Sequence, residues 1–139
     1  MKLLQLKFIP QSTDFGLLLL RIWVGLTMFL NHGFGKVMNF SSMMEKFPDA
    51  IGIGRTPALI LVIFAEVICA LMLTIGWYAR FAALSLAITM GVAFFIAHGG
   101  SLAAGPGSGE LAFVYLAAFV ALVFAGPGRF SLDVKKGGI

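Results

Sequence analysis

The fold is decided by residues 15–37, which read FGLLLLRIWVGLTMFLNHGFGKV. A helix of this length and apolarity crosses the roughly 30 Å hydrocarbon core of a bilayer. Arg21 lies inside the stretch, and His32 and Lys36 lie near its end. The 11 residues from Arg21 to His32 make about three helical turns, so both share one helix face, and Lys36 follows one turn later. Because a charge facing lipid is costly, we expect this face to be turned toward protein or water.

The composition of the whole chain indicates a polytopic membrane protein. Of its 139 residues, 60% are hydrophobic and 12% are charged, and the mean hydropathy is +0.99. Soluble domains carry about 25% charged residues. The net charge of +4 comes mostly from loops and tails, which indicates membrane topology and no nucleic-acid partner. The single cysteine, Cys69, excludes an internal disulfide and a CxxC redox pair.

Three more apolar stretches follow the first and predict further transmembrane helices. They cover residues 57–76, 81–98 and 110–125. Together with residues 15–37 they predict an all-α fold, a four-transmembrane-helix bundle that occupies residues 1–139 as a single domain.

A short amphipathic segment separates the first two predicted spans. Phe40, Met43, Met44 and Phe47 recur at the spacing of one helix face. We therefore expect a short helix over residues 40–47 that lies in the membrane interface. An ordinary loop, in which these residues are hydrophobic by chance, is the alternative.

The basic residues predict the orientation of the bundle. If both termini lie on one side, six basic residues share that side and three lie on the other. The six are Lys2, Lys7, Arg80, Arg129, Lys135 and Lys136, and the three are Lys36, Lys46 and Arg55. The positive-inside rule then places both termini in the cytoplasm.

Arg21 and Glu66 are charged residues well inside the predicted spans. Counted at about 1.5 Å per residue, their depths in helices one and two differ by a distance that an arginine side chain bridges. The simplest interpretation is a structural ion pair inside the membrane, because pairing is how such charges persist in lipid. A proton or substrate path, or two separately solvated sites, are the alternatives.

A second polar group gathers at the opposite ends of the predicted helices. His32, Lys36, His98 and Glu110 all arrive at the non-cytoplasmic face if the spans alternate in direction. They serve as helix caps and snorkelling side chains in the simplest interpretation. A quinone headgroup above an apolar cleft is the main functional alternative. His32, His98 and Glu110 are weak candidates for metal ligands because no local ligand pair such as HxxxH occurs, and bis-histidine haem ligation is less favoured still.

These residues, in this order, resemble the DoxX family of small four-helix bacterial membrane proteins. The resemblance rests on Arg21, His32-Gly33 with Lys36, Glu66, Gly76 with Arg80, His98, Gly109-Glu110 and the ending GPGRFSLD at residues 126–133, and so extends over nearly the whole chain. It implies a four-helix fold in the bacterial cytoplasmic membrane. The family takes its name from a subunit of a thiosulfate:quinone oxidoreductase, and other members are linked to redox defence. Relatives in the wider superfamily act as cargo receptors or assembly factors.

Two functional hypotheses follow from the residues and the resemblance. The first is a small subunit of a quinone-linked membrane redox system, with the polar group as a headgroup or proton site and a partner redox protein supplying electrons. The second is a non-enzymatic receptor or assembly factor that binds a partner protein, such as an exported one. A stand-alone enzyme is disfavoured because the chain has no cofactor motif and no cysteine pair.

Overall fold

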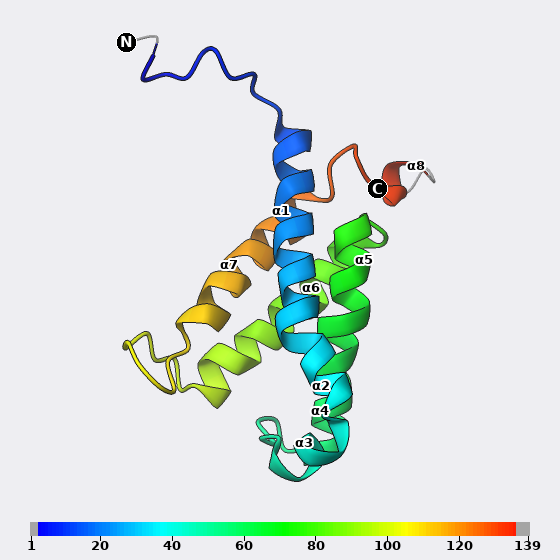
Figure 1. The fold of residues 1–139 in the computed structure, drawn as a ribbon, viewed down its shortest axis with the longest axis vertical. Helices are drawn as coiled ribbons and strands as arrows, with labels where there is room; N and C mark the ends of the chain where they lie inside the picture. The colour runs from blue at the N-terminus through cyan, green and yellow to red at the C-terminus, as the bar shows by residue number, and fades with distance from the viewer. Residues whose placement is uncertain (1–2, 136–139) are drawn as a thin grey trace.

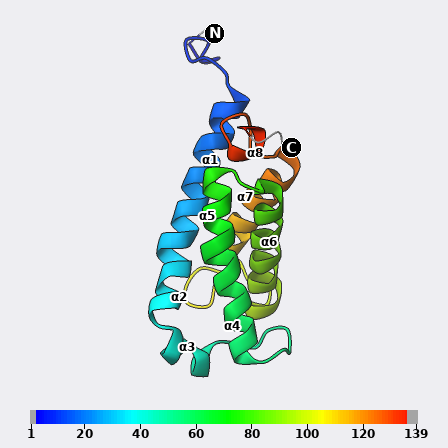
Figure 2. The same ribbon diagram turned by 90° about the vertical axis from the view of Figure 1, so that its right-hand side faces the viewer.

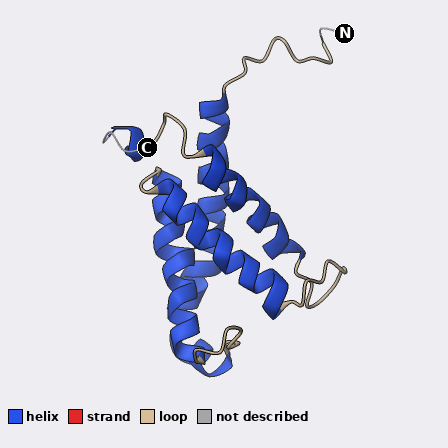
Figure 3. Cartoon of the chain, turned by 180° about the vertical axis from the view of Figure 1, so that it is seen from behind, coloured by secondary structure: helices blue, strands red, loops and turns tan. Residues whose placement is uncertain are grey.

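The computed structural model describes residues 3–135, and this part of the chain contains helices, turns and loops but no strand (Figure 3). Lys2 and Lys136, counted above for the orientation, lie outside the described residues. The α-helices are α1 (Thr13–Met28), α2 (Phe34–Met38), α3 (Phe40–Lys46), α4 (Arg55–Ile63), α5 (Ala70–Ile75), α6 (Ala79–Val92), α7 (Glu110–Ala125) and α8 (Leu132–Lys135).

Three π-helical turns join these helices into longer ones. The turn Phe29–Gly33 links α1 to α2, Phe64–Cys69 links α4 to α5, and Ala93–Ala97 extends α6. The described residues thus contain three helices long and apolar enough to cross a membrane, which are Thr13–Met38, Arg55–Ile75 and Ala79–Ala97.

The predicted spans therefore correspond to helices, with ends that differ by one or two residues. The predicted fourth span, residues 110–125, forms the apolar helix α7, but its 16 residues extend only about 24 Å. Its crossing of the bilayer stays a prediction. The predicted helix over residues 40–47 forms as α3, and its place in a membrane interface likewise stays a prediction.

The helices run between two distinct ends of the bundle (Figure 1). The start of α1, the turn between α5 and α6, the end of α7, and α8 lie at one end, here called the termini end (Figures 1 and 2). Helix α3 and the connection between α6 and α7 lie toward the other, here called the loop end. The long helices α1–α2 and α4–α5 run antiparallel beside one another, and α6 packs along α7.

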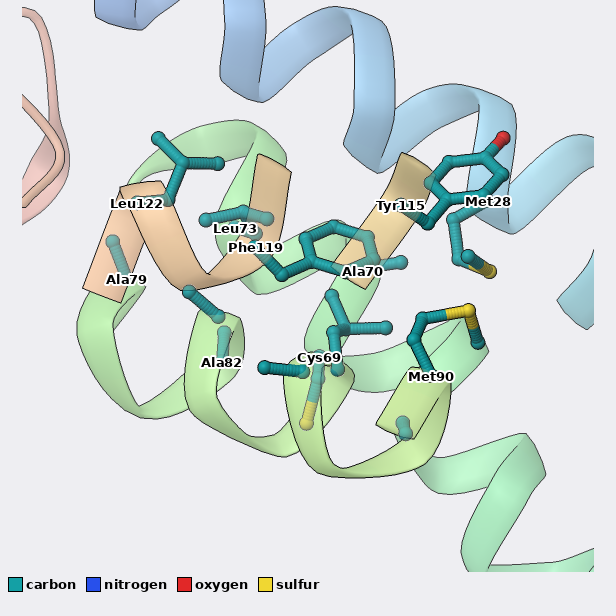
Figure 4. Packing of buried hydrophobic residues seen from close by; sticks show 14 of the residues in the cluster. Met28, Cys69, Ala70, Leu73, Ala79, Ala82, Met90, Tyr115, Phe119 and Leu122 are labelled. Atoms are coloured by element: carbon teal, nitrogen blue, oxygen red, sulfur yellow. The ribbon is translucent and has the colours of Figure 1, made fainter. Parts of the chain in front are cut away.

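The core is filled by interlocking large and small side chains (Figure 4). Phe119 of α7 has no exposed surface and lies against Ala70 and Leu73 of α5. Small residues line the buried face of α6, where Ala79, Ala82, Ala83 and Ala87 recur. Such residues let helices approach closely, which is how membrane helices gain packing energy.

Arg21 is completely buried at the termini end and binds backbone carbonyl groups. Its guanidinium donates to the carbonyl oxygens of Leu73 at 3.2 Å and Thr74 at 3.1 Å, and also to that of Phe130. The first two carbonyls belong to the last turn of α5, where backbone carbonyl groups lack a full set of intrahelical donors, and the Leu73 oxygen also accepts from the Gly76 N–H at 3.1 Å. Arg21 therefore ties α1 to the end of α5 and to the C-terminal segment.

The C-terminal segment completes this arrangement, which we call the C-terminal clasp (Arg21 with residues 130–133). The Asp133 carboxylate accepts hydrogen bonds from the backbone N–H groups of Tyr78 at 2.7 Å and Ala79 at 2.9 Å, and so caps α6. Gly76, at φ +75°, has no room for a side chain because a Cβ would meet Ser131 and Arg21. The clasp therefore locks three helices together at the termini end.

The structure does not form the predicted ion pair between Arg21 and Glu66. The reason is the register of the antiparallel helices, which places Arg21 level with Leu73 and Thr74. Glu66 lies seven residues before Leu73, or about 10 Å farther from the termini end. Glu66 pairs instead with Lys36, at the far end of the same basic stripe.

Candidate functional site

A cavity of about 460 Å³ lies toward the loop end of the bundle. Its volume falls within the range of about 300–1,000 Å³ that is typical of small-molecule sites. Most of its lining is apolar, with Met28, Leu61 and Met90 among the contributors. The polar side chains in its lining are His32, Lys36, Glu66, Thr89, His98, Ser108 and Tyr115. The cavity therefore joins a small polar group to a large apolar space, the usual composition of a site for a lipophilic ligand.

An ion pair between Lys36 and Glu66 forms the charged part of the lining. The Lys36 Nζ lies 2.6 Å from the Glu66 Oε2, and the two side chains are 17% and 5% exposed. The attraction between these charges is strong where water is scarce, and each offsets the cost of burying the other. Lys36 keeps two further N–H donors and Glu66 keeps its second oxygen. The pair is therefore neutral overall but still able to bind a polar ligand group.

Gly33 brings the two helices together at this ion pair. A Cβ at Gly33 would lie 2.5 Å from the backbone oxygen of Glu66 and 2.7 Å from its carbonyl carbon. Since backbone atoms cannot swing aside, any larger residue would push the helices apart. The absence of a side chain at this position thus lets Lys36, three residues later, reach Glu66, with His32, the preceding residue, in the same cavity lining.

Each π-helical turn supplies part of the cavity lining. His32 lies in the first, Glu66 in the second, and Ala93 and Ala97 in the third, which His98 directly follows. Such turns are rare, and they occur frequently at functional sites. Their coincidence at one cavity makes this region the candidate site. Sequence periodicity did not reveal the turns, because one extra residue per turn scarcely alters an apolar pattern.

Tyr115 of α7 is a site residue that the sequence reasoning missed. It is only 6% exposed, and its ring meets the His32 imidazole edge to face at a centroid distance of 5.8 Å. On its other side the ring stacks on Phe119 at 5.7 Å and 16°. A tyrosine inside an otherwise apolar helix was an available signal, because a buried phenol needs a polar neighbour.

His98 and Glu110 have different relations to the cavity. His98 lines its edge and is exposed, with Nδ1 2.6 Å from the Ala93 carbonyl oxygen. Because a carbonyl oxygen only accepts hydrogen bonds, Nδ1 is the donor in this contact. Glu110 is exposed at the start of α7 and does not line the cavity, although Ser108 and Leu111 on either side of it do.

The predicted polar group is therefore brought together only in part. The cavity unites His32, Lys36 and His98, adds Glu66 and Tyr115, and leaves out Glu110. Among residues 3–135, no three His, Cys, Asp or Glu side chains gather closely enough to hold a metal ion. The set of His32, His98 and Glu110, considered above as weak metal ligands, does not assemble in this structure.

The connection between α3 and α4 closes one side of the cavity. Phe47, Pro48, Ala50 and Ile51 contribute to the lining. The Asp49 carboxylate accepts hydrogen bonds from the N–H groups of Ile53 at 2.9 Å and Gly54 at 3.0 Å, and so fixes the shape of this connection. The short segment after the first long helix therefore forms part of the site.

Comparisons with known proteins identify the family of the chain. The DoxX family model matches residues 16–99, more than half of the chain, and this range holds Arg21, His32, Lys36, Glu66 and His98. A protein of Haemophilus influenzae, named only as an uncharacterized protein, is 34% identical over 116 residues, which cover 78% of this chain and 81% of the relative. No solved structure matches the chain. The chain belongs to the DoxX family and is a membrane protein with a helical, apolar fold.

Proposed function

We propose that the chain is a small integral-membrane subunit of a quinone-linked redox system and that its cavity binds the quinone headgroup. One observation carries the proposal: an apolar cavity of about 460 Å³ has a buried Lys36–Glu66 ion pair in its lining, with His32 nearby. A quinone ring needs an apolar space and a few polar groups to orient it.

The polar residues suit the two oxidation states of a quinone. The free N–H groups of Lys36 are donors for a quinone carbonyl, and Glu66 and a neutral His32 are acceptors for the hydroxyl groups of a quinol. Reduction of a quinone takes two electrons and two protons. In this proposal a partner redox protein supplies the electrons, and water at the loop end supplies the protons by way of Lys36 and His32. The chain itself would bind, orient and protonate the ring.

We further propose that α7 is a fourth membrane span, so that residues 1–139 form one four-span domain. A short apolar helix such as α7 is accommodated by local thinning of the bilayer. In this arrangement the termini end faces the cytoplasm, the cavity lies toward the outer face of the cytoplasmic membrane, and α3 lies in the interface. The described basic residues in elements at the termini end support this orientation, and they are Lys7, Arg80, Arg129 and Lys135.

Gentle purification followed by quinone analysis tests the proposed function. The protein is extracted in a mild detergent, its lipids are analysed for quinone, and binding of a tail-free benzoquinone is titrated. We expect close to one quinone per chain, and weaker retention by His32→Ala. Protein free of quinone that fails to bind added benzoquinone would contradict the proposal. If a partner protein then co-purified in stoichiometric amount, the receptor or assembly-factor hypothesis would be favoured.

A further inference from the structure

A second, smaller hollow lies beside the cavity, between α1 and α7. It measures about 210 Å³ and is lined by Trp23, Val24 and Thr27 of α1 together with residues of α7. We call this hollow the lateral groove. Trp23 is 74% exposed, on the outer surface of a helix long enough to cross the membrane. The groove therefore opens toward the surface that lipid would cover.

The lateral groove and the cavity share part of their lining. Leu111 and Tyr115, one helical turn apart on α7, line both spaces. Tyr115 is held between His32 and Phe119 by the ring contacts described above, and it lies beside Met28 in the core (Figure 4). Leu111 is 56% exposed, so its side chain is free to change rotamer. Tyr115, which is held in place, and Leu111, which is free to move, thus lie between the groove and the cavity.

The lining of the lateral groove suits a hydrocarbon chain. No charged side chain lines it, and Val24, Val114 and Ala118 present only apolar atoms. A hydrocarbon chain makes no hydrogen bonds and so needs no polar partner in the groove. The charged side chains Lys36 and Glu66, in contrast, lie on the cavity side, where they can bind a polar headgroup.

We propose that the lateral groove holds the hydrocarbon tail of a lipophilic ligand whose headgroup occupies the cavity, and that Leu111 and Tyr115 form the passage between the two. This inference rests on the proposed function and specifies how its ligand enters, which is sideways from the lipid. The ligand class is a ring headgroup carrying an isoprenoid or alkyl tail. Leu111 moves to admit the tail, while Tyr115 holds its position and separates the tail from His32.

The test compares a tail-free benzoquinone with the same ring carrying a decyl tail, each titrated into the full-length protein in one detergent. Ala118→Phe places a large ring in the lateral groove, and Ala117→Phe, on the exposed neighbour outside it, is the matched control. We expect Ala118→Phe to weaken binding of the decyl compound by about tenfold, because the new ring fills the space that the tail would occupy. Binding of the tail-free compound should be unchanged in both variants, and Ala117→Phe should bind both compounds as the wild type does.

The outcomes separate this inference from the function on which it rests. If the wild type binds the tail-free ring but Ala118→Phe affects the decyl compound no more than Ala117→Phe does, the tail lies elsewhere and the inference is overturned. If the wild type binds neither compound, the proposed function itself fails.

A second measurement avoids substitution altogether, in case Ala118→Phe does not fold. The wild-type protein is photolabelled with a quinone that carries a diazirine at the end of its tail, and the modified residues are located by mass spectrometry. We expect labels within residues 23–27 and 111–118. Labels confined to α4, α5 or α6 would overturn the inference.

Discussion

Arg21 and Lys36 lie on the same stripe of one helix, yet they bind different kinds of partner at the two ends of the bundle. At the termini end, Arg21 has no exposed surface and donates to three backbone carbonyl groups. At the cavity, Lys36 pairs with one carboxylate, that of Glu66, and its side chain remains 17% exposed. The carbonyl contacts of Arg21 and the ion pair of Lys36 each compensate a positive charge inside an apolar helix.

We interpret this difference as that between a structural role for Arg21 and a ligand-binding role for Lys36. Backbone carbonyls are fixed, so the C-terminal clasp holds Arg21 in one position. A side-chain ion pair beside a cavity has unused hydrogen-bonding groups and can bind a ligand between or beside its members. We therefore expect substitutions at the clasp to change stability and substitutions at the ion pair to change binding.

The largest effect is expected from Arg21→Met. Three carbonyl groups would lose hydrogen bonds to a charged donor, each contributing about 1.5–3 kcal/mol, so the loss in free energy of unfolding should reach several kcal/mol. Folded yield and SDS-induced unfolding of the purified protein measure this loss. Arg21→Lys should recover only part of it because an ammonium lacks the planar fork of donors. Wild-type stability in Arg21→Met would show that the clasp is not structural.

A somewhat smaller effect is expected where the helices cross at the ion pair. Gly33→Ala should lower the free energy of unfolding by about 1–3 kcal/mol, because the new Cβ meets the Glu66 backbone. Gly35→Ala is the matched control, since a Cβ there meets nothing within 4 Å. Unfolding of both variants under the same conditions gives the comparison. Equal stabilities would mean that the close approach at Gly33 is not required.

The partner of Glu66 is tested by double-mutant cycles. Combining Glu66→Gln with Lys36→Met should give a coupling energy of about 0.5–3 kcal/mol in unfolding experiments, as expected for side chains in contact. Combining Glu66→Gln with Arg21→Lys should give effects that add to within about 0.5 kcal/mol. The reverse result, with coupling to Arg21 alone, would restore the ion pair that the sequence predicted.

The smallest effect is expected at Glu110. This residue is exposed and does not line the cavity, so Glu110→Gln should change stability by no more than about 0.5 kcal/mol. The Glu110→Gln variant should bind benzoquinone as tightly as the wild type does, whereas His32→Ala should bind it more weakly. Titration of both variants decides the point. A loss of binding in Glu110→Gln as large as that in His32→Ala would return Glu110 to the site.

The sequence was sufficient to predict the helices and the buried stripe. Arg21, on the face that was expected to turn toward protein or water, is buried, and Gly25 and Met28 are the other buried residues of α1. Apolar runs of this length leave few alternatives in a membrane protein, so the helix ends were predicted to within one or two residues.

The partner of Glu66 was beyond the reach of the sequence, because it depends on how far one helix is shifted along another. Counting residues from a membrane surface gives a depth, but it does not give that shift. Two glycines set it here: Gly25 packs against Ala70 and Thr74, and Gly33 packs against Glu66. These contacts place Glu66 opposite Lys36, and they exist only once the helices have packed.

The central claim is that the Lys36–Glu66 ion pair serves a ligand while the Arg21 clasp serves the fold. Binding of tail-free benzoquinone to the Lys36→Met/Glu66→Gln double variant tests it most directly. Replacing both members of a buried pair leaves no unpaired charge, so the variant should fold with near wild-type resistance to SDS. We predict that its affinity for the ring falls by about tenfold or more, since the orienting hydrogen bonds are lost. A folded double variant that binds the ring as tightly as the wild type would contradict the claim.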